Sequence, residues 1–138
     1  MTYPIKDSRV AKQAFRGEEV QMFKYLSHMA KCLAFACVIA IVHQSLQPGS
    51  GFPPTSHTDK LYHAGAYGIL AVWTVLGWPF GRSLYIFLGL TLLGGTVELA
   101  QGVMDIGRTA SWLDALANAV GIGCVLIIRQ VIRRLFLK

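Results

Sequence analysis

Residues 83–104 read SLYIFLGLTLLGGTVELAQGVM, an apolar stretch in which Glu98 is the only formally charged side chain. A helix rises 1.5 Å per residue, so about 20 apolar residues are enough to cross the hydrocarbon core of a bilayer. The stretch therefore predicts a membrane-spanning helix that carries one carboxylate near its end.

Three other stretches have the same character, at residues 25–46, 61–78 and 112–128. The joints between the four stretches, at 47–58, 79–82 and 105–110, are short, and Pro48, Pro53 and Pro54 keep the first of them from continuing a helix. Short joints make consecutive helices antiparallel. The sequence thus predicts an all-α fold, a four-helix transmembrane bundle over residues 25–138.

The composition agrees with a membrane domain. The chain has 138 residues, of which 54% are hydrophobic and 14% charged, whereas a soluble domain has about 45–50% and 25%. This balance argues against a disordered tail, a coiled coil and most small soluble enzymes. The three cysteines, Cys32, Cys37 and Cys124, form no CxxC pair, which argues against a disulfide scaffold and the common zinc-binding modules.

The basic residues predict the orientation. Of the 13 Lys and Arg residues, only Lys60 and Arg108 belong to the side of the bundle away from the termini. Since Lys and Arg concentrate on the cytoplasmic side, both termini are expected in the cytoplasm, with the loops at 47–60 and 105–111 facing outward. Attraction to anionic lipid explains the basic ends, so we expect no nucleic-acid partner.

An N-terminal arm, residues 1–24, precedes the first predicted span. Apolar and basic side chains alternate in it, and Gly17 interrupts the pattern. We expect a short amphipathic helix on the inner membrane surface, or alternatively a loosely ordered basic tail. The first span begins too late and is too long for a cleaved signal peptide, so we expect it to remain in the protein.

Polar residues form stripes on the second, third and fourth spans. Helical spacing puts each stripe on one face of its helix. The residues are Asp59, Lys60, His63 and Tyr67 on the second span, Glu98 and Gln101 on the third, and Ser111, Asp114 and Asn118 on the fourth, with Arg108 in the loop before it.

These stripes are expected to meet at one depth. Glu98 precedes the end of its span at Met104 by as many residues as Asn118 follows Trp112, which is about 9 Å of helix in each case. His63 is close to the same boundary. We therefore predict one polar pocket in the outer third of the bundle, open to the outside, and ionisable groups inside a membrane point to function.

The residue types favour an anionic ligand. Lys60, His63 and Arg108 are donors suited to phosphate or carboxylate, and the carboxylates of the stripes would balance their charge. Three alternatives stay open: a set of ion pairs that only clamps the helices, a proton pathway, and a divalent metal held by Asp59, His63, Glu98 and Asp114. No tight ligand spacing in the sequence supports a metal, so we expect neither a metal nor a cofactor.

The polar residues resemble a known family. The runs Asp59-Lys60-x-x-His63-x-x-x-Tyr67, Glu98-x-x-Gln101 and Arg108-x-x-Ser111-x-x-Asp114-x-x-x-Asn118-x-x-Gly121 are similar to those of the VanZ-like family, over about residues 56–124. The resemblance implies a small multi-pass protein of the bacterial cytoplasmic (inner) membrane. The family is named for a member linked to teicoplanin resistance, which points to the cell envelope and to glycopeptide or lipid-linked precursors. A resistance role is not carried over to this chain.

Three functions compete at this point. The first is an accessory protein of the cell envelope that binds an anionic phosphate or lipid headgroup, with membrane lipids and a lipid-linked envelope precursor as partners. The second is a structural subunit that associates with other membrane subunits. The third is an intramembrane hydrolase or transferase acting on lipid-linked phosphate, with His63 or Glu98 as the catalytic residue. The Arg-Pro and Ser-Gly-His signatures of lipid phosphatases are absent, which argues against an enzyme.

Overall fold

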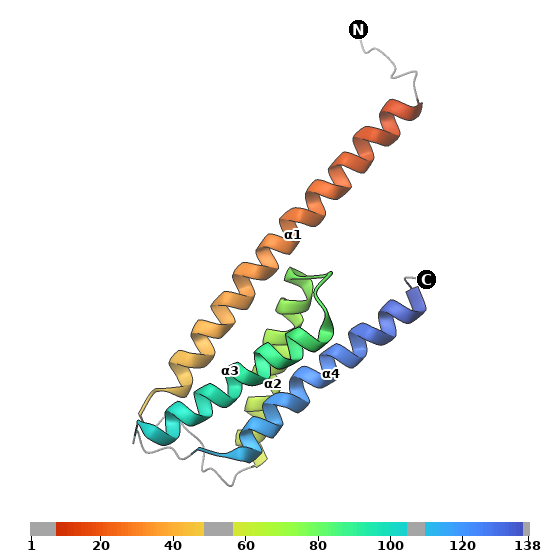
Figure 1. Ribbon diagram of the computed structural model, residues 1–138. Helices are drawn as coiled ribbons and strands as arrows, with labels where there is room; N and C mark the ends of the chain where they lie inside the picture. Colours follow the sequence, from red (N-terminus) through yellow and green to blue (C-terminus); the bar gives the residue numbers. More distant parts are fainter. Residues whose placement is uncertain (1–7, 49–56, 105–109, 137–138) are drawn as a thin grey trace.

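The structure, a computed structural model, describes residues 8–48, 57–104 and 110–136. Within these ranges it consists of four helices and no strand: α1 (Ser8–Ser45), α2 (His57–Gly77), α3 (Ser83–Val103) and α4 (Trp112–Phe136) (Figure 1). The all-helical prediction is confirmed. The starts of the third and fourth predicted spans coincide with the starts of α3 and α4, and α4 continues beyond the predicted end at residue 128.

The first helix differs from the expectation. A short helix interrupted at Gly17 and separate from the first span was predicted, but α1 runs unbroken from Ser8 through Gly17 and past residue 24. A Cβ placed at Gly17 would meet no atom within 4 Å, so this glycine lies in an open stretch of helix. Glycine in a helix costs only about 1 kcal/mol relative to alanine, too little to end a 38-residue helix.

The N-terminal part of α1 extends well beyond the other helices (Figure 1). At 38 residues, α1 is about 57 Å long, whereas the hydrocarbon core of a bilayer is about 30 Å thick. The start of α1 and the end of α4 lie toward the same end of the bundle, as does the turn between α2 and α3 (Figure 1).

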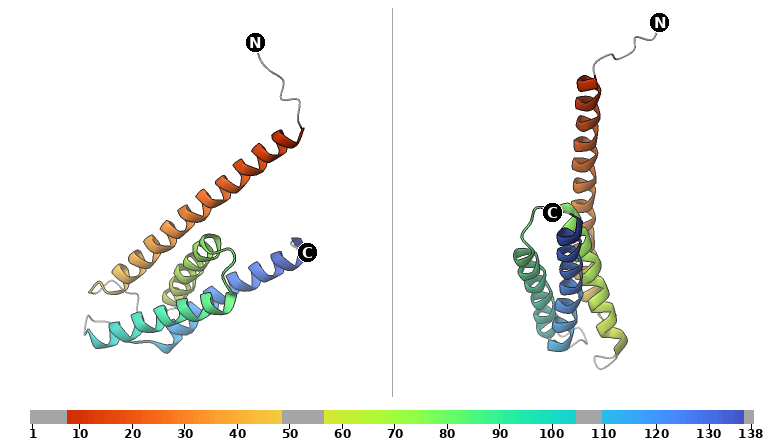
Figure 2. Two further views of the ribbon diagram at one scale, coloured as in Figure 1. Left: turned by 45° about the horizontal axis from the view of Figure 1, so that its top comes forward. Right: turned by 90° about the vertical axis from the view of Figure 1, so that its right-hand side faces the viewer.

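Helix α2 is at the centre of the arrangement. It packs against α1 on one side and, most extensively, against α4 on the other, while α3 packs mainly against α4 (Figures 1 and 2). The apolar core includes Ala34 of α1, Leu70 and Ala71 of α2, and Ile122 and Leu126 of α4.

Small residues bring α2 and α4 together. A Cβ at Gly121 would overlap the backbone carbonyl of Ala64, and a Cβ at Gly68 would lie 3.7 Å from the carbonyl oxygen of Gly121. Close approach at small residues is typical of helix packing in membranes, where no hydrophobic effect drives helices together. This contact fixes the spacing of the two helices one turn below His63 and Asn118.

Burial follows the pattern of a membrane protein. Large apolar side chains such as Phe35, Leu92 and Ile127 are more than 60% exposed, while several charged and amide side chains are buried. Three helical segments are long and apolar enough to cross a membrane: Phe15–Ser45, Ser83–Val103 and Trp112–Phe136. A surface this apolar would be a strong association or aggregation liability in water, and it suggests a membrane protein. Helix α2, whose first turns are polar, is not among the three segments.

Arg129 fixes the opposite end of the bundle. Its guanidinium donates to the carbonyl oxygens of Pro79 (2.6 Å) and Gly81 (2.9 Å) and to Ser83 Oγ (3.3 Å). The side chain is buried, so this arginine holds α4 against the turn between α2 and α3. In the sequence it looks like one more basic residue at the end of a span.

Candidate functional site

The polar stripes meet at the end of the bundle where α2 and α4 begin and α3 ends (Figure 1). We call the following seven residues the polar cluster: Asp59, Lys60 and His63 of α2, Glu98 of α3, Ser111 directly before α4, and Asp114 and Asn118 of α4. Six of them make a hydrogen bond or a close polar contact to another member of the cluster. The seventh, Asp59, has a carboxylate oxygen within 4.8 Å of ligand atoms of His63 and Asp114.

His63 is at the centre of the cluster. Its Nδ1 lies 3.1 Å from Oδ1 of Asn118 and 3.6 Å from Oε1 of Glu98. Both neighbours are oxygen acceptors, so Nδ1 carries a proton and donates it. One imidazole of α2 thereby contacts both α3 and α4, and its orientation is fixed by the two partners.

Lys60 pairs with Asp114. The ammonium Nζ donates to Oδ1 over 3.1 Å. The lysine side chain is 23% exposed and the aspartate side chain only 6%. The lysine therefore connects the buried cluster with the surface at this end of the bundle.

Ser111 shapes the start of α4. Its hydroxyl accepts a hydrogen bond from the backbone N–H of Asp114 at 3.3 Å, as an N-cap residue does. Its own backbone N–H donates to Oε2 of Glu98 at 3.2 Å. Glu98 is therefore held on one oxygen by the start of α4 and faces His63 with the other.

Tyr67 lies one helical turn below His63 and is almost fully buried. A Cβ at Gly94 would lie 3.3 Å from Cζ of Tyr67 and 2.9 Å from Nδ2 of Asn118. The glycine thus leaves room for both side chains against α3. The Tyr67 hydroxyl is buried and has no hydrogen-bond partner within the described parts of the chain.

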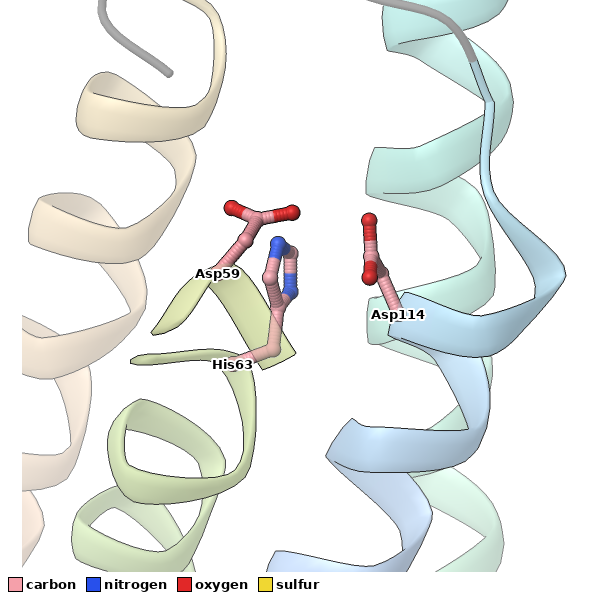
Figure 3. A group of neighbouring side chains, drawn as sticks. All are labelled: Asp59, His63 and Asp114. Carbon is pink, nitrogen blue, oxygen red and sulfur yellow. The ribbon is translucent and has the colours of Figure 1, made fainter. Parts of the chain in front are cut away.

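Three ligand-type side chains come together at the top of the cluster. The carboxylates of Asp59 and Asp114 and the imidazole of His63 each offer an atom, and these atoms lie within 4.8 Å of one another. Figure 3 shows the imidazole standing between the two carboxylates, with one ring nitrogen directed toward the Asp59 side. Both aspartates are buried and His63 is partly buried.

One predicted site residue of the described chain, Gln101, stands apart from the cluster. Gln101 is fully buried, but its amide Nε2 donates to the backbone carbonyl of Ser45 over 2.8 Å. It therefore connects α3 to the end of α1, whereas the sequence predicted it in the polar pocket. Arg108 lies outside the described residues. The contact between Gln101 and Ser45 could not be anticipated, because a backbone carbonyl carries no sequence signal.

The described part of the cluster holds more carboxylates than cationic groups. Three carboxylates are buried, those of Asp59, Glu98 and Asp114. The described residues set one ammonium group, that of Lys60, and the imidazole of His63 against them. The sequence predicted three donors balanced by these three carboxylates, and the third donor, Arg108, is not among the described residues.

Comparison with known proteins adds no identification: no family model matches the chain, and neither a curated protein nor a solved structure matches it.

Proposed function

We propose that the chain is an integral membrane protein of the bacterial cell envelope in which all four helices cross the cytoplasmic membrane. The support for α2 as a fourth span is its position between α1 and α4. Its 21 residues give a helix of about 31 Å. Asp59 and Tyr67, which lower its hydropathy, are buried among the other helices, and lipid does not contact them.

Both termini lie in the cytoplasm in this proposal, and the polar cluster lies near the outer surface. Basic residues are frequent in the first half of α1 and in the last turns of α4, and these two segments lie toward the same end of the bundle (Figure 1), which is the arrangement that the positive-inside rule predicts. Single cysteines in a cysteine-free background test it. In intact cells a membrane-impermeant maleimide should label Thr58→Cys and spare Arg16→Cys, and the reverse pattern would contradict the orientation.

The function supported best is binding of an anionic ligand, a phosphate group such as a lipid headgroup carries, at the outer end of the bundle. The observation that carries it is Lys60, a partly exposed ammonium held by a buried carboxylate of another helix. A structural ion pair does not need such exposure. Fixing the lysine in advance lowers the ordering cost of binding a phosphate.

The polar motifs support placing the chain in the VanZ-like family, whose members belong to the bacterial envelope. Residues of separate motifs contact one another: His63 contacts Asn118 and Glu98, and Glu98 contacts Ser111. The three motifs therefore contribute to one site.

A binding measurement tests the proposal. Tag-free protein in phosphatidylcholine nanodiscs is titrated with a polyprenyl phosphate and, separately, with inorganic phosphate. The comparison shows whether the site binds a lipid headgroup or a free phosphate ion. Wild-type protein should bind the lipid, and Lys60→Gln should weaken binding several-fold. Arg134→Gln, which also removes one positive charge but from an exposed position near the end of α4, should leave lipid binding unchanged.

The outcomes separate the competing functions. Equal binding by wild-type and Lys60→Gln protein would contradict the site. Absence of binding together with a stoichiometric protein partner in native mass spectrometry would favour the structural-subunit function. Release of inorganic phosphate that is lost in His63→Gln would favour the hydrolase.

A further inference from the structure

We infer that Asp59, His63 and Asp114 form a binding site for a divalent transition-metal ion of the Zn²⁺ type. The three side chains place their ligand atoms within 4.8 Å of one another (Figure 3). Zn²⁺ binds nitrogen and carboxylate oxygen at about 2.0–2.2 Å, so two ligand atoms of a tetrahedral ion lie about 3.3–3.6 Å apart. Side-chain rotations that draw the three atoms closer together would bring all three onto one ion.

The partners of His63 give an independent reason. A histidine that binds a metal through one ring nitrogen usually donates the N–H of its other nitrogen to an oxygen acceptor. The Nδ1 of His63 has Asn118 Oδ1 at 3.1 Å and Glu98 Oε1 at 3.6 Å. These contacts place the proton on Nδ1. In the neutral imidazole, the lone pair is then on Nε2.

The Nε2 lone pair lies near the carboxylate oxygens of the two aspartates. With Nδ1 engaged by Asn118, the nitrogen on the Asp59 side in Figure 3 is Nε2. Three electron-rich atoms, one nitrogen and two carboxylate oxygens, then point to a common centre in a buried place. A cation between them would be attracted by all three atoms, and the low dielectric of a buried place strengthens that attraction.

The donor set selects the class of ion. Imidazole nitrogen suits Zn²⁺ and its neighbours in the transition series, while an all-oxygen site would suit Mg²⁺ or Ca²⁺. Three protein ligands leave one position of a tetrahedral ion for an outside ligand. Lys60, whose ammonium is 3.1 Å from the same Asp114, stands where it would contact an anion bound to that position. This last step rests on the proposed function, whereas metal binding itself does not.

Titration with Co²⁺ tests the site directly. Tag-free protein with its three cysteines replaced by alanine is titrated in detergent, and the visible absorption of Co²⁺ bound by nitrogen and oxygen ligands is followed; Zn²⁺ should displace the Co²⁺. His63→Gln and Asp59→Asn should each weaken Co²⁺ binding by more than the ~10-fold that loss of an outer partner costs. His57→Gln, at an exposed histidine of the same helix, is the matched control.

Lys60→Met separates this inference from the proposed function. Removing the ammonium should tighten Co²⁺ binding, because two positive charges no longer repel, and should weaken binding of the polyprenyl phosphate. Metal binding without lipid binding would support the metal site and contradict the proposed function. Lipid binding that persists unchanged in EDTA would support the proposed function and contradict a role of the metal ion in holding the anion. The metal site would be overturned if wild-type protein failed to bind Co²⁺, or if His57→Gln and His63→Gln lost equal Co²⁺ affinity. Gel filtration of each variant checks that it is folded.

Discussion

Gly121 of α4 lies directly against the backbone carbonyl of Ala64 of α2, so closely that a Cβ at position 121 would overlap the carbonyl oxygen. Ala64 follows His63 in the chain, and Gly121 is one turn from Asn118. This close approach of the two backbones is therefore adjacent to the hydrogen bond between His63 and Asn118, so the helix spacing and the site geometry depend on the same glycine.

Gly121→Val should separate α2 from α4. Overpacking of a tight contact costs about 1–3 kcal/mol, so the thermal unfolding temperature in detergent should fall, and Co²⁺ or lipid binding should weaken with it. Gly123→Val is the control, since a Cβ at Gly123 meets no atom within 4 Å. An equal loss of stability in both variants would mean that valine itself, and not the contact with Ala64, is responsible.

Gly94→Ala should disturb the site without unfolding the bundle. The new methyl group would lie 2.9 Å from Nδ2 of Asn118, and the amide has to turn away from His63. In protein labelled with ¹⁵N at its four histidines, one pair of ring signals, identified by its loss in His63→Gln, should move. Gly95→Ala adds a methyl group that meets nothing within 4 Å, so its spectrum should match wild type; a wild-type spectrum for Gly94→Ala would contradict the packing described.

The periodicity of the sequence predicted the faces of the helices well. Asp59, His63, Glu98, Asp114 and Asn118 converge because a spacing of three or four residues puts side chains on one face regardless of tertiary contacts. The sequence also predicted carboxylates that balance the donors, and Lys60 is paired with Asp114. Which donor pairs with which carboxylate could not be predicted, because the spacing within one helix does not specify the partner on the next.

Helix neighbours and helix ends were harder to predict. The short turn at 79–82 connects α2 and α3, yet α2 packs far more against α4, because the small residues Gly68 and Gly121 allow a closer approach. The continuity of α1 through Gly17 was not predicted, because the sequence analysis treated this glycine as an interruption although one glycine is only a weak helix breaker. The partners of Gln101 and Arg129 are mostly backbone carbonyls, which any residue can supply.

Gln101→Leu should loosen the end of α1. The substitution keeps the approximate size of the side chain but removes the donor to Ser45 O, and loss of a partly buried hydrogen bond costs about 0.5–1.5 kcal/mol. Amide hydrogen exchange near Ser45 should become faster and the unfolding temperature should fall. Gln130→Leu, on an exposed face of α4, should change neither. Unchanged exchange in Gln101→Leu would show that this hydrogen bond does not hold α1.

Arg129→Gln should destabilise the end of the bundle opposite to the polar cluster. The arginine donates to Pro79 O, Gly81 O and Ser83 Oγ, and the shorter amide cannot reach all three. Hydrogen bonds from a charged group contribute about 1.5–3 kcal/mol each, so the unfolding temperature should fall clearly, whereas Co²⁺ affinity at the distant cluster should stay close to wild type. Arg134→Gln removes an equal charge from an exposed position of the same helix and should leave stability unchanged. A similar drop in both variants would assign the effect to net charge near the membrane surface instead of to the contacts with the turn.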